Sequence, residues 1–252
     1  MAARVVVFLD DGGVMSDNAR RAPQWQCLVG EYFAPILGGT PTAWAEANRV
    51  LTARLFDPAA WQARLQAAPD YASFDRRYQL DWLGGMCGLL GIPAPPEAEG
   101  RELARRATAY ITERVRAAFP AAVPAIRTLH HAGIPLHTAS GESSADLAGY
   151  LTGMGVRECF GHLYGPDLIN TLKNGPAYYT RIFAAAGVAP ADALVVDDNP
   201  QAAAWAQAAG ARVVLVCPGP HLEAGPAWVI PTLAELPGII ERLLPDGAGP
   251  GR

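Results

Sequence analysis

Lysine is almost missing from this 252-residue sequence: Lys173 is the only one, and arginine supplies every other side chain that is fully cationic at neutral pH. Codon bias explains such a preference in general. A compact ammonium and a planar guanidinium are nevertheless not interchangeable in a tight site, so Lys173 marks a candidate functional position. Charged side chains of either sign are also scarce, at 17%, and the formal net charge is -4. Without clustered Lys and Arg, the chain is not expected to bind nucleic acid.

Long apolar runs are missing too. None approaches the roughly 18 residues needed to span a bilayer, and the opening residues lack the features of a signal peptide. The four cysteines form no CxxC pair, which argues against a disulfide framework or a zinc site and indicates buried thiols. They are Cys27, Cys87, Cys159 and Cys217. We therefore expect a cytoplasmic protein that does not associate with membranes.

Short apolar runs and Ala-rich helical stretches alternate along the chain. The apolar runs are typical of strands buried on both faces of a parallel sheet, and they cover residues 5–9, 134–139, 193–196 and 211–216. The predicted helices cover residues 121–132, 144–154, 177–186 and 200–209. This alternation predicts an α/β fold with a doubly wound parallel sheet.

Residues 21–118 interrupt that alternation. They are helical in character and rich in aromatic side chains, and they hold no comparable strand-like run. The length of the chain accommodates a core and a smaller insertion. We predict a core domain of residues 1–20 and 119–245 and an inserted helical cap domain of residues 21–118. The alternative is that these helices pack on the sheet. Residues 246–252 are expected to be disordered, because they offer almost nothing to bury.

Polar residues follow several of the predicted strands. Asp10 ends the first, Ser140 the second and Asp197 the third. The carboxyl ends of parallel strands line the ligand crevice of a doubly wound sheet. These residues are therefore expected to converge in space.

Four segments resemble, in order, the four motifs of the haloacid dehalogenase (HAD) superfamily. Residues 8–14, FLDDGGV, are similar to the first motif, and Ser140-Gly141 to the second. Lys173, shortly before Pro176, resembles the third, and residues 195–199, VVDDN, resemble the acidic fourth. The resemblance covers nearly the whole chain. It implies a Rossmann-like HAD core with an inserted cap and a hydrolase activity.

The resemblance implies that Asp10 is a nucleophile towards phosphorus, assisted by Mg²⁺. The metal ligands would be Asp10, the backbone carbonyl of Gly12, and Asp197, with Asp198 as a direct or an outer ligand. Magnesium prefers such hard oxygen donors. The alternative for Asp197-Asp198 is an ordinary acidic pair in a turn.

The remaining implied roles concern the phosphate. Ser140 and the N–H of Gly141 would bind its oxygens close to a helix N-terminus, and Lys173 would face Asp10 and the phosphoryl group. The alternatives are a helix N-cap for Ser140 and a solvated surface position for Lys173.

The sequence departs from the family pattern at Gly12, where phosphatases of the family carry a second Asp that serves as general acid and base. Such help is worth about 10²- to 10⁴-fold in rate. Without this general acid and base, three outcomes stay open. The protein turns over only substrates with good leaving groups, another residue such as Glu142 takes the role, or the protein binds its ligand without turnover.

We predict a small-molecule phosphatase, monomeric or homodimeric, that acts on a small phosphorylated metabolite. Two alternatives stay open. One is a 2-haloacid dehalogenase-like hydrolase, which also uses an aspartate nucleophile but needs no metal. The other is a non-catalytic protein that binds a phosphate ligand.

Overall fold

The chain folds into two compact units. The computed structural model describes residues 5–217 and 228–244, so the predicted disordered tail lies outside the described residues. One unit runs up to Asn18 and resumes at Ala117, and the other spans Ala19–Arg116. Each boundary falls two residues before the predicted one.

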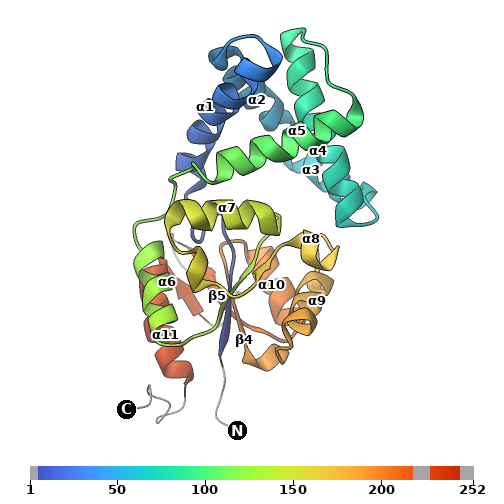
Figure 1. The fold of residues 1–252 in the computed structure, drawn as a ribbon. Coiled ribbons are helices and arrows are strands. Elements are labelled where there is room, and N and C mark those ends of the chain that lie inside the picture. The colour runs from blue at the N-terminus through green and yellow to red at the C-terminus, as the bar shows by residue number, and fades with distance from the viewer. Residues whose placement is uncertain (1–4, 218–227, 245–252) are drawn as a thin grey trace. The chain divides into compact units, whose positions relative to one another are not determined.

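A six-stranded parallel sheet forms the centre of the first unit (Figure 1). Its order is β3-β2-β1-β4-β5-β6. The strands are β1 (Val6–Leu9), β2 (Leu136–Ala139), β3 (Leu163–Tyr164), β4 (Ala193–Asp197), β5 (Arg212–Val216) and β6 (Trp228–Ile230). The predicted α/β fold with a doubly wound parallel sheet is confirmed. After β1 the chain builds β2 and β3 on one side and then returns to β4 on the other, so the topological switch lies beside β1.

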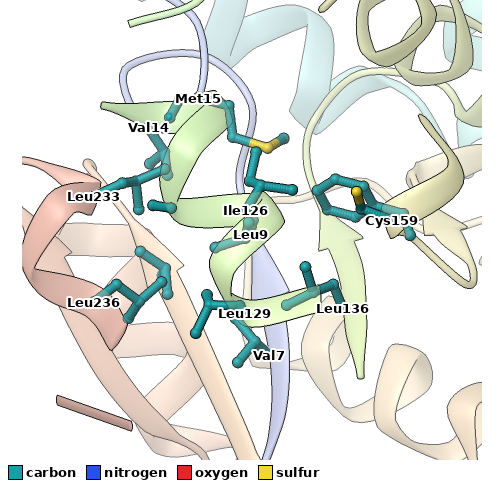
Figure 2. Packing of buried hydrophobic residues seen from close by; sticks show 14 of the residues in the cluster. Val7, Leu9, Val14, Met15, Ile126, Leu129, Leu136, Cys159, Leu233 and Leu236 are labelled. Carbon is teal, nitrogen blue, oxygen red and sulfur yellow. The ribbon is translucent and has the colours of Figure 1, made fainter. Parts of the chain in front are cut away.

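Helices cover both faces of this sheet. They are α6 (Ala122–His131), α7 (Ser144–Met154), α8 (Pro166–Ile169), α9 (Pro176–Ala186), α10 (Pro200–Ala208) and α11 (Leu236–Leu243). Alternate residues of each strand point to opposite faces. Val7 and Leu9 of β1 therefore pack in one cluster with residues of α6, α7 and α11 (Figure 2). Val6 and Phe8 pack in the other, with residues of α9 and α10.

The regular elements of the second unit are all helices. Its helices are α1 (Asn18–Leu37, of which Asn18 belongs to the first unit), α2 (Pro41–Leu55), α3 (Pro58–Ala67), α4 (Tyr71–Leu90) and α5 (Glu97–Thr112). Phe33, Trp44 and Trp82 form the centre of its core. The ring of Phe33 stacks on that of Trp44 with centroids 5.1 Å apart, and Trp82 donates a hydrogen bond of 2.8 Å to Asn48.

The cysteines bear out the sequence prediction only in part. All four are free thiols, and Cys87 and Cys159 are buried. The prediction of burial is wrong for Cys27, which is exposed on α1, and Cys217 is only half-buried. Across the described residues, no helix combines the length and hydropathy that a membrane span requires.

Phe8 provides a test of the core. Its side chain is fully buried in the middle strand, with ring contacts to His137 and Phe183 at 5.3 and 5.4 Å. We expect Phe8→Ala to lower the free energy of unfolding by about 3–5 kcal/mol, because a buried aromatic ring is replaced by a cavity. Urea titration measures the loss. Leu168→Ala is the control, since Leu168 is 53% exposed in the same unit, and it should change stability by less than about 0.5 kcal/mol.

Candidate active site

Asp10 and Asp197 end neighbouring strands of the sheet. Leu9 of β1 pairs with Val196 of β4, and the N–H of Asp10 donates to the carbonyl of Val196 at 2.9 Å. Asp10 is 8% exposed and Asp197 is fully buried. The parallel register therefore brings two carboxylates together at the carboxyl edge, beside the topological switch.

Lys173 lies between these carboxylates. Its Nζ is 3.1 Å from Oδ1 of Asp10 and 2.8 Å from Oδ2 of Asp197, and its side chain is 12% exposed. The alternative of a solvated surface lysine is therefore wrong. Burial alone would lower the pKa of Lys173, but the charge of Asp10, the Tyr179 hydroxyl and the charge of Asp197 together hold that pKa well above 10.5.

Three groups contact the buried carboxylate of Asp197. It accepts hydrogen bonds from the Tyr179 hydroxyl at 3.2 Å and from the N–H of Asn199 at 3.0 Å, in addition to its contact with Lys173. Burial raises the pKa of Asp197, Lys173 lowers it, and the nearby charge of Asp10 raises it again. The net pKa is above the usual value because the carboxylate has lost nearly all its solvent.

Asp198 completes a cluster of three carboxylates. Oxygens of Asp10, Asp197 and Asp198 all lie within 4.8 Å of one another. A Cβ added to Gly13, whose φ is +79°, would lie only 1.9 Å from Oδ2 of Asp198. The Asp198 carboxylate therefore packs directly on the backbone of the turn that follows Asp10. Partial burial and then the charges of Asp10 and Asp197 raise the pKa of Asp198 to about 6.

The donor chemistry of this cluster suits Mg²⁺. Magnesium binds hard oxygen ligands at about 2.0–2.1 Å, so oxygens on opposite sides of the ion are roughly 4 Å apart. The spacing of the three carboxylates is compatible with that geometry after a small shift. Asp10, Asp197 and Asp198 would hold the ion. The predicted contribution of the Gly12 carbonyl stays a prediction.

Ser140 and Gly141 lie one strand away from Asp10. Leu9 pairs with Thr138 of β2, which places Ser140 at the same edge of the sheet. Ser140 is 2% exposed, and its carbonyl accepts a hydrogen bond of 2.6 Å from Tyr178. The alternative role of Ser140 as a helix N-cap is wrong, because Ser143 caps α7 by accepting from the N–H of Asp146. Phosphate binding by Ser140 and Gly141 stays a prediction.

Tyr178 and Tyr179 were not predicted as site residues. Both lie on the first turn of α9, shortly after Lys173, and both are fully buried. Their hydroxyls fix the carbonyl of Ser140 and the carboxylate of Asp197. The detectable signal was a pair of hydroxyl-bearing aromatics at the start of the helix that follows the lone lysine.

Asp11 has a structural role. Its carboxylate accepts a hydrogen bond of 2.8 Å from Ser16, and its carbonyl accepts from the N–H groups of Met15 and Ser16 at 2.8 and 2.9 Å. Asp11 is fully buried. It therefore shapes the turn after β1 and does not provide the carboxylate that Gly12 lacks.

Comparison with known proteins relates this architecture to one family. Residues 30–210 match the family model of the haloacid dehalogenase-like hydrolases. No curated protein matches the sequence. Three solved structures illustrate the likeness, and because all are at most 21% identical they establish the fold alone.

The first is an L-2-haloacid dehalogenase from Xanthobacter autotrophicus, with 18% identity, a TM-score of 0.61 and coverage of 94% of this chain and 98% of that chain. A 2-haloacid dehalogenase from Pseudomonas syringae has 21% identity and a TM-score of 0.63, over 95% of this chain and 99% of that chain. An HAD phosphatase from Thermococcus onnurineus has 20% identity and a TM-score of 0.58, over 94% and 97%.

The raised pKa of Asp198 predicts a pH-dependent cost to stability. An unfolded Asp ionises near pH 4, whereas folded Asp198 ionises near pH 6. The folded chain therefore resists this ionisation, and stability is lost as the pH rises through that window. Between pH 4 and 6, the free energy of unfolding of the native protein should fall by about 1 kcal/mol relative to that of Asp198→Asn. This figure is reduced because solvent screens the partly exposed carboxylate. Urea titrations in EDTA at several pH values measure the difference, and a pH-independent difference would contradict the prediction.

Proposed function

Because the chain belongs to the haloacid dehalogenase-like hydrolases, we propose that it is a Mg²⁺-dependent hydrolase of small phosphate monoesters with Asp10 as nucleophile. The observation that supports this proposal is the excess of carboxylates over cationic side chains in the site. Three carboxylates, those of Asp10, Asp197 and Asp198, have oxygens within 4.8 Å of one another, and Lys173 contacts two of them, Asp10 and Asp197.

This excess of negative charge explains why a divalent cation belongs to the proposal. A phosphate dianion brought to the site would be repelled by the ionised carboxylates. Bound Mg²⁺ would offset that charge and polarise a phosphoryl oxygen. Lys173 contributes a fixed positive charge at the same place, and preorganised charges of this kind are typically the largest catalytic contribution in a buried site.

The chain's own residues then supply a two-step reaction. A carboxylate oxygen of Asp10 attacks phosphorus, the bond between phosphorus and the ester oxygen breaks, and the alcohol leaves with the electron pair. Water then attacks the aspartyl-phosphate, which restores Asp10 and releases inorganic phosphate. Lys173, whose Nζ is 3.1 Å from Oδ1 of Asp10, holds this carboxylate in position for the attack.

Gly12 limits which esters react well. Because position 12 has no carboxyl to protonate the leaving oxygen, the leaving group must depart as a stable oxyanion. Acyl phosphates meet this condition best, because they release a carboxylate, and sugar 1-phosphates come nearer to it than ordinary alkyl phosphates. The proposed substrate class is therefore a small phosphorylated metabolite with a good leaving group.

Dehalogenation of a 2-haloacid is the second candidate. Asp10 would attack the carbon that bears the halogen, halide would leave, and water would hydrolyse the ester. The absence of a side chain at Gly12 favours this candidate, since halide needs no proton, and the dehalogenases among the similar structures agree with it. Against it stands the repulsion between an anionic haloacid and the Asp197-Asp198 pair. Ligand binding without turnover is the third possibility.

An assay with p-nitrophenyl phosphate, with Mg²⁺ or with EDTA, tests the main proposal. We expect Mg²⁺-dependent release of p-nitrophenol. Asp10→Asn should reduce kcat by more than about 10³-fold, because loss of a nucleophile leaves only binding and electrostatic contributions. Asp192→Asn is the matched control, since Asp192 precedes β4 and lies at the opposite edge of the sheet.

Halide release from 2-chloropropionate in EDTA separates the candidates. Halide release lost in Asp10→Asn, without phosphatase activity, would replace the main proposal with the dehalogenase. If neither substrate is turned over, calorimetry with inorganic phosphate and Mg²⁺ tests for a binding protein.

A further inference from the structure

The side-chain amide of Asn18 lies against Gly12. A Cβ added to Gly12 would be 3.0 Å from both Nδ2 and Oδ1 of Asn18. The amide therefore occupies the space into which any side chain at position 12 would begin to extend. Gly12 is two residues after Asp10 and half-buried in the turn that also carries Gly13 against Asp198. The Asn18 amide thus takes the place of a side chain at the position two residues after the reacting carboxylate.

The backbone around Asn18 is fixed, whereas its amide is available. The N–H of Asp17 donates to the carbonyl of Ala117 at 2.8 Å, and that of Gly13 donates to the carbonyl of Ser16 at 2.8 Å. These bonds hold both ends of the turn. Asn18 is exposed, and within residues 5–217 and 228–244 its amide has no hydrogen-bond partner. A donor and an acceptor are therefore free to meet a ligand or water.

We propose that Asn18 is a positioning residue, whose Nδ2 donates a hydrogen bond to the leaving-group oxygen and whose Oδ1 then orients the attacking water. This inference rests on the proposed phosphatase function and deepens it. An amide does not transfer a proton, so the leaving group departs as an oxyanion and takes its proton from solvent. The site therefore selects esters by the stability of that oxyanion.

The charge of the site explains why an amide fits here better than a carboxylate. Asp10, Asp197 and Asp198 already place three carboxylates around one lysine. A fourth carboxylate beside Gly12 would add repulsion to the nucleophile and to the phosphate. The neutral amide offers hydrogen bonds without that cost.

A series of aryl phosphates with leaving groups of graded acidity tests the proposal on the full chain with Mg²⁺. Asn18→Ala should lower kcat for phenyl phosphate by about 10- to 100-fold, as expected for the loss of a hydrogen bond to a charged oxygen. For 2,4-dinitrophenyl phosphate the loss should stay within about threefold, because little charge on that oxygen needs support. The plot of log kcat against leaving-group pKa should therefore become steeper, with little change in KM.

Asn18→Asp gives the converse test. Its carboxyl would stand where a proton donor is missing, so turnover of phenyl phosphate should recover relative to Asn18→Ala and rise as the pH falls through the pKa of the new group. Gln26→Ala, on the same helix α1, is the control and should leave the slope unchanged.

Three outcomes would overturn the proposal. If Asn18→Ala keeps the native slope of log kcat against leaving-group pKa, Asn18 does not interact with the leaving group. If kcat falls equally for every ester, Asn18 has a structural role. Both leave the phosphatase proposal intact. A native protein that hydrolyses none of the esters removes the phosphatase function and this inference with it.

Discussion

The contact of one ammonium with two carboxylates is the interaction on which the site depends. Parallel register places Asp10 and Asp197 at the ends of adjacent strands, where their charges repel each other with little solvent to screen them. Lys173 relieves that repulsion at 2.8 and 3.1 Å. Removing one member of such a buried set typically costs several kcal/mol, since the others lose their compensation. The sheet can therefore carry both carboxylates only while the loop before α9 holds this lysine in place.

The turn after β1 connects fold and chemistry at the same point. Asp11 closes the turn through Ser16, and Gly13 adopts a φ of +79° that lets the Asp198 carboxylate approach the backbone. Side chains at positions 12 and 13 would meet Asn18 and Asp198 respectively. The two glycines thus leave room for the amide of Asn18 and the carboxylate of Asp198 against the backbone of the turn that follows Asp10.

Much of the fold followed from apolar patterning, because β1, β4 and β5 are buried on both faces and consist almost entirely of apolar residues. The strands β3 and β6 have two and three residues, too few to form such a pattern. The sequence was enough to predict four site residues, because each lies in a recognisable motif at the end of a strand or shortly before a helix. These residues are Asp10, Lys173, Asp197 and Asp198. Tyr178 and Tyr179 left a signal in the sequence, but the partners of their hydroxyls depend on tertiary packing. The contact of Asn18 with Gly12 depends on the shape of the turn after β1 and left no pattern in the sequence.

The near absence of lysine has a consequence for chemical modification. The single ε-amino group of the chain is 12% exposed and paired with Asp10 and Asp197. Amine reagents attack the neutral form, and the neighbouring carboxylates keep the pKa of Lys173 far above the pH of ordinary labelling reactions. Arginine elsewhere gives such reagents no competing ε-amino target. The rate at which the ε-amino group of Lys173 is acylated therefore measures how often this side chain separates from Asp10 and Asp197 in the folded protein.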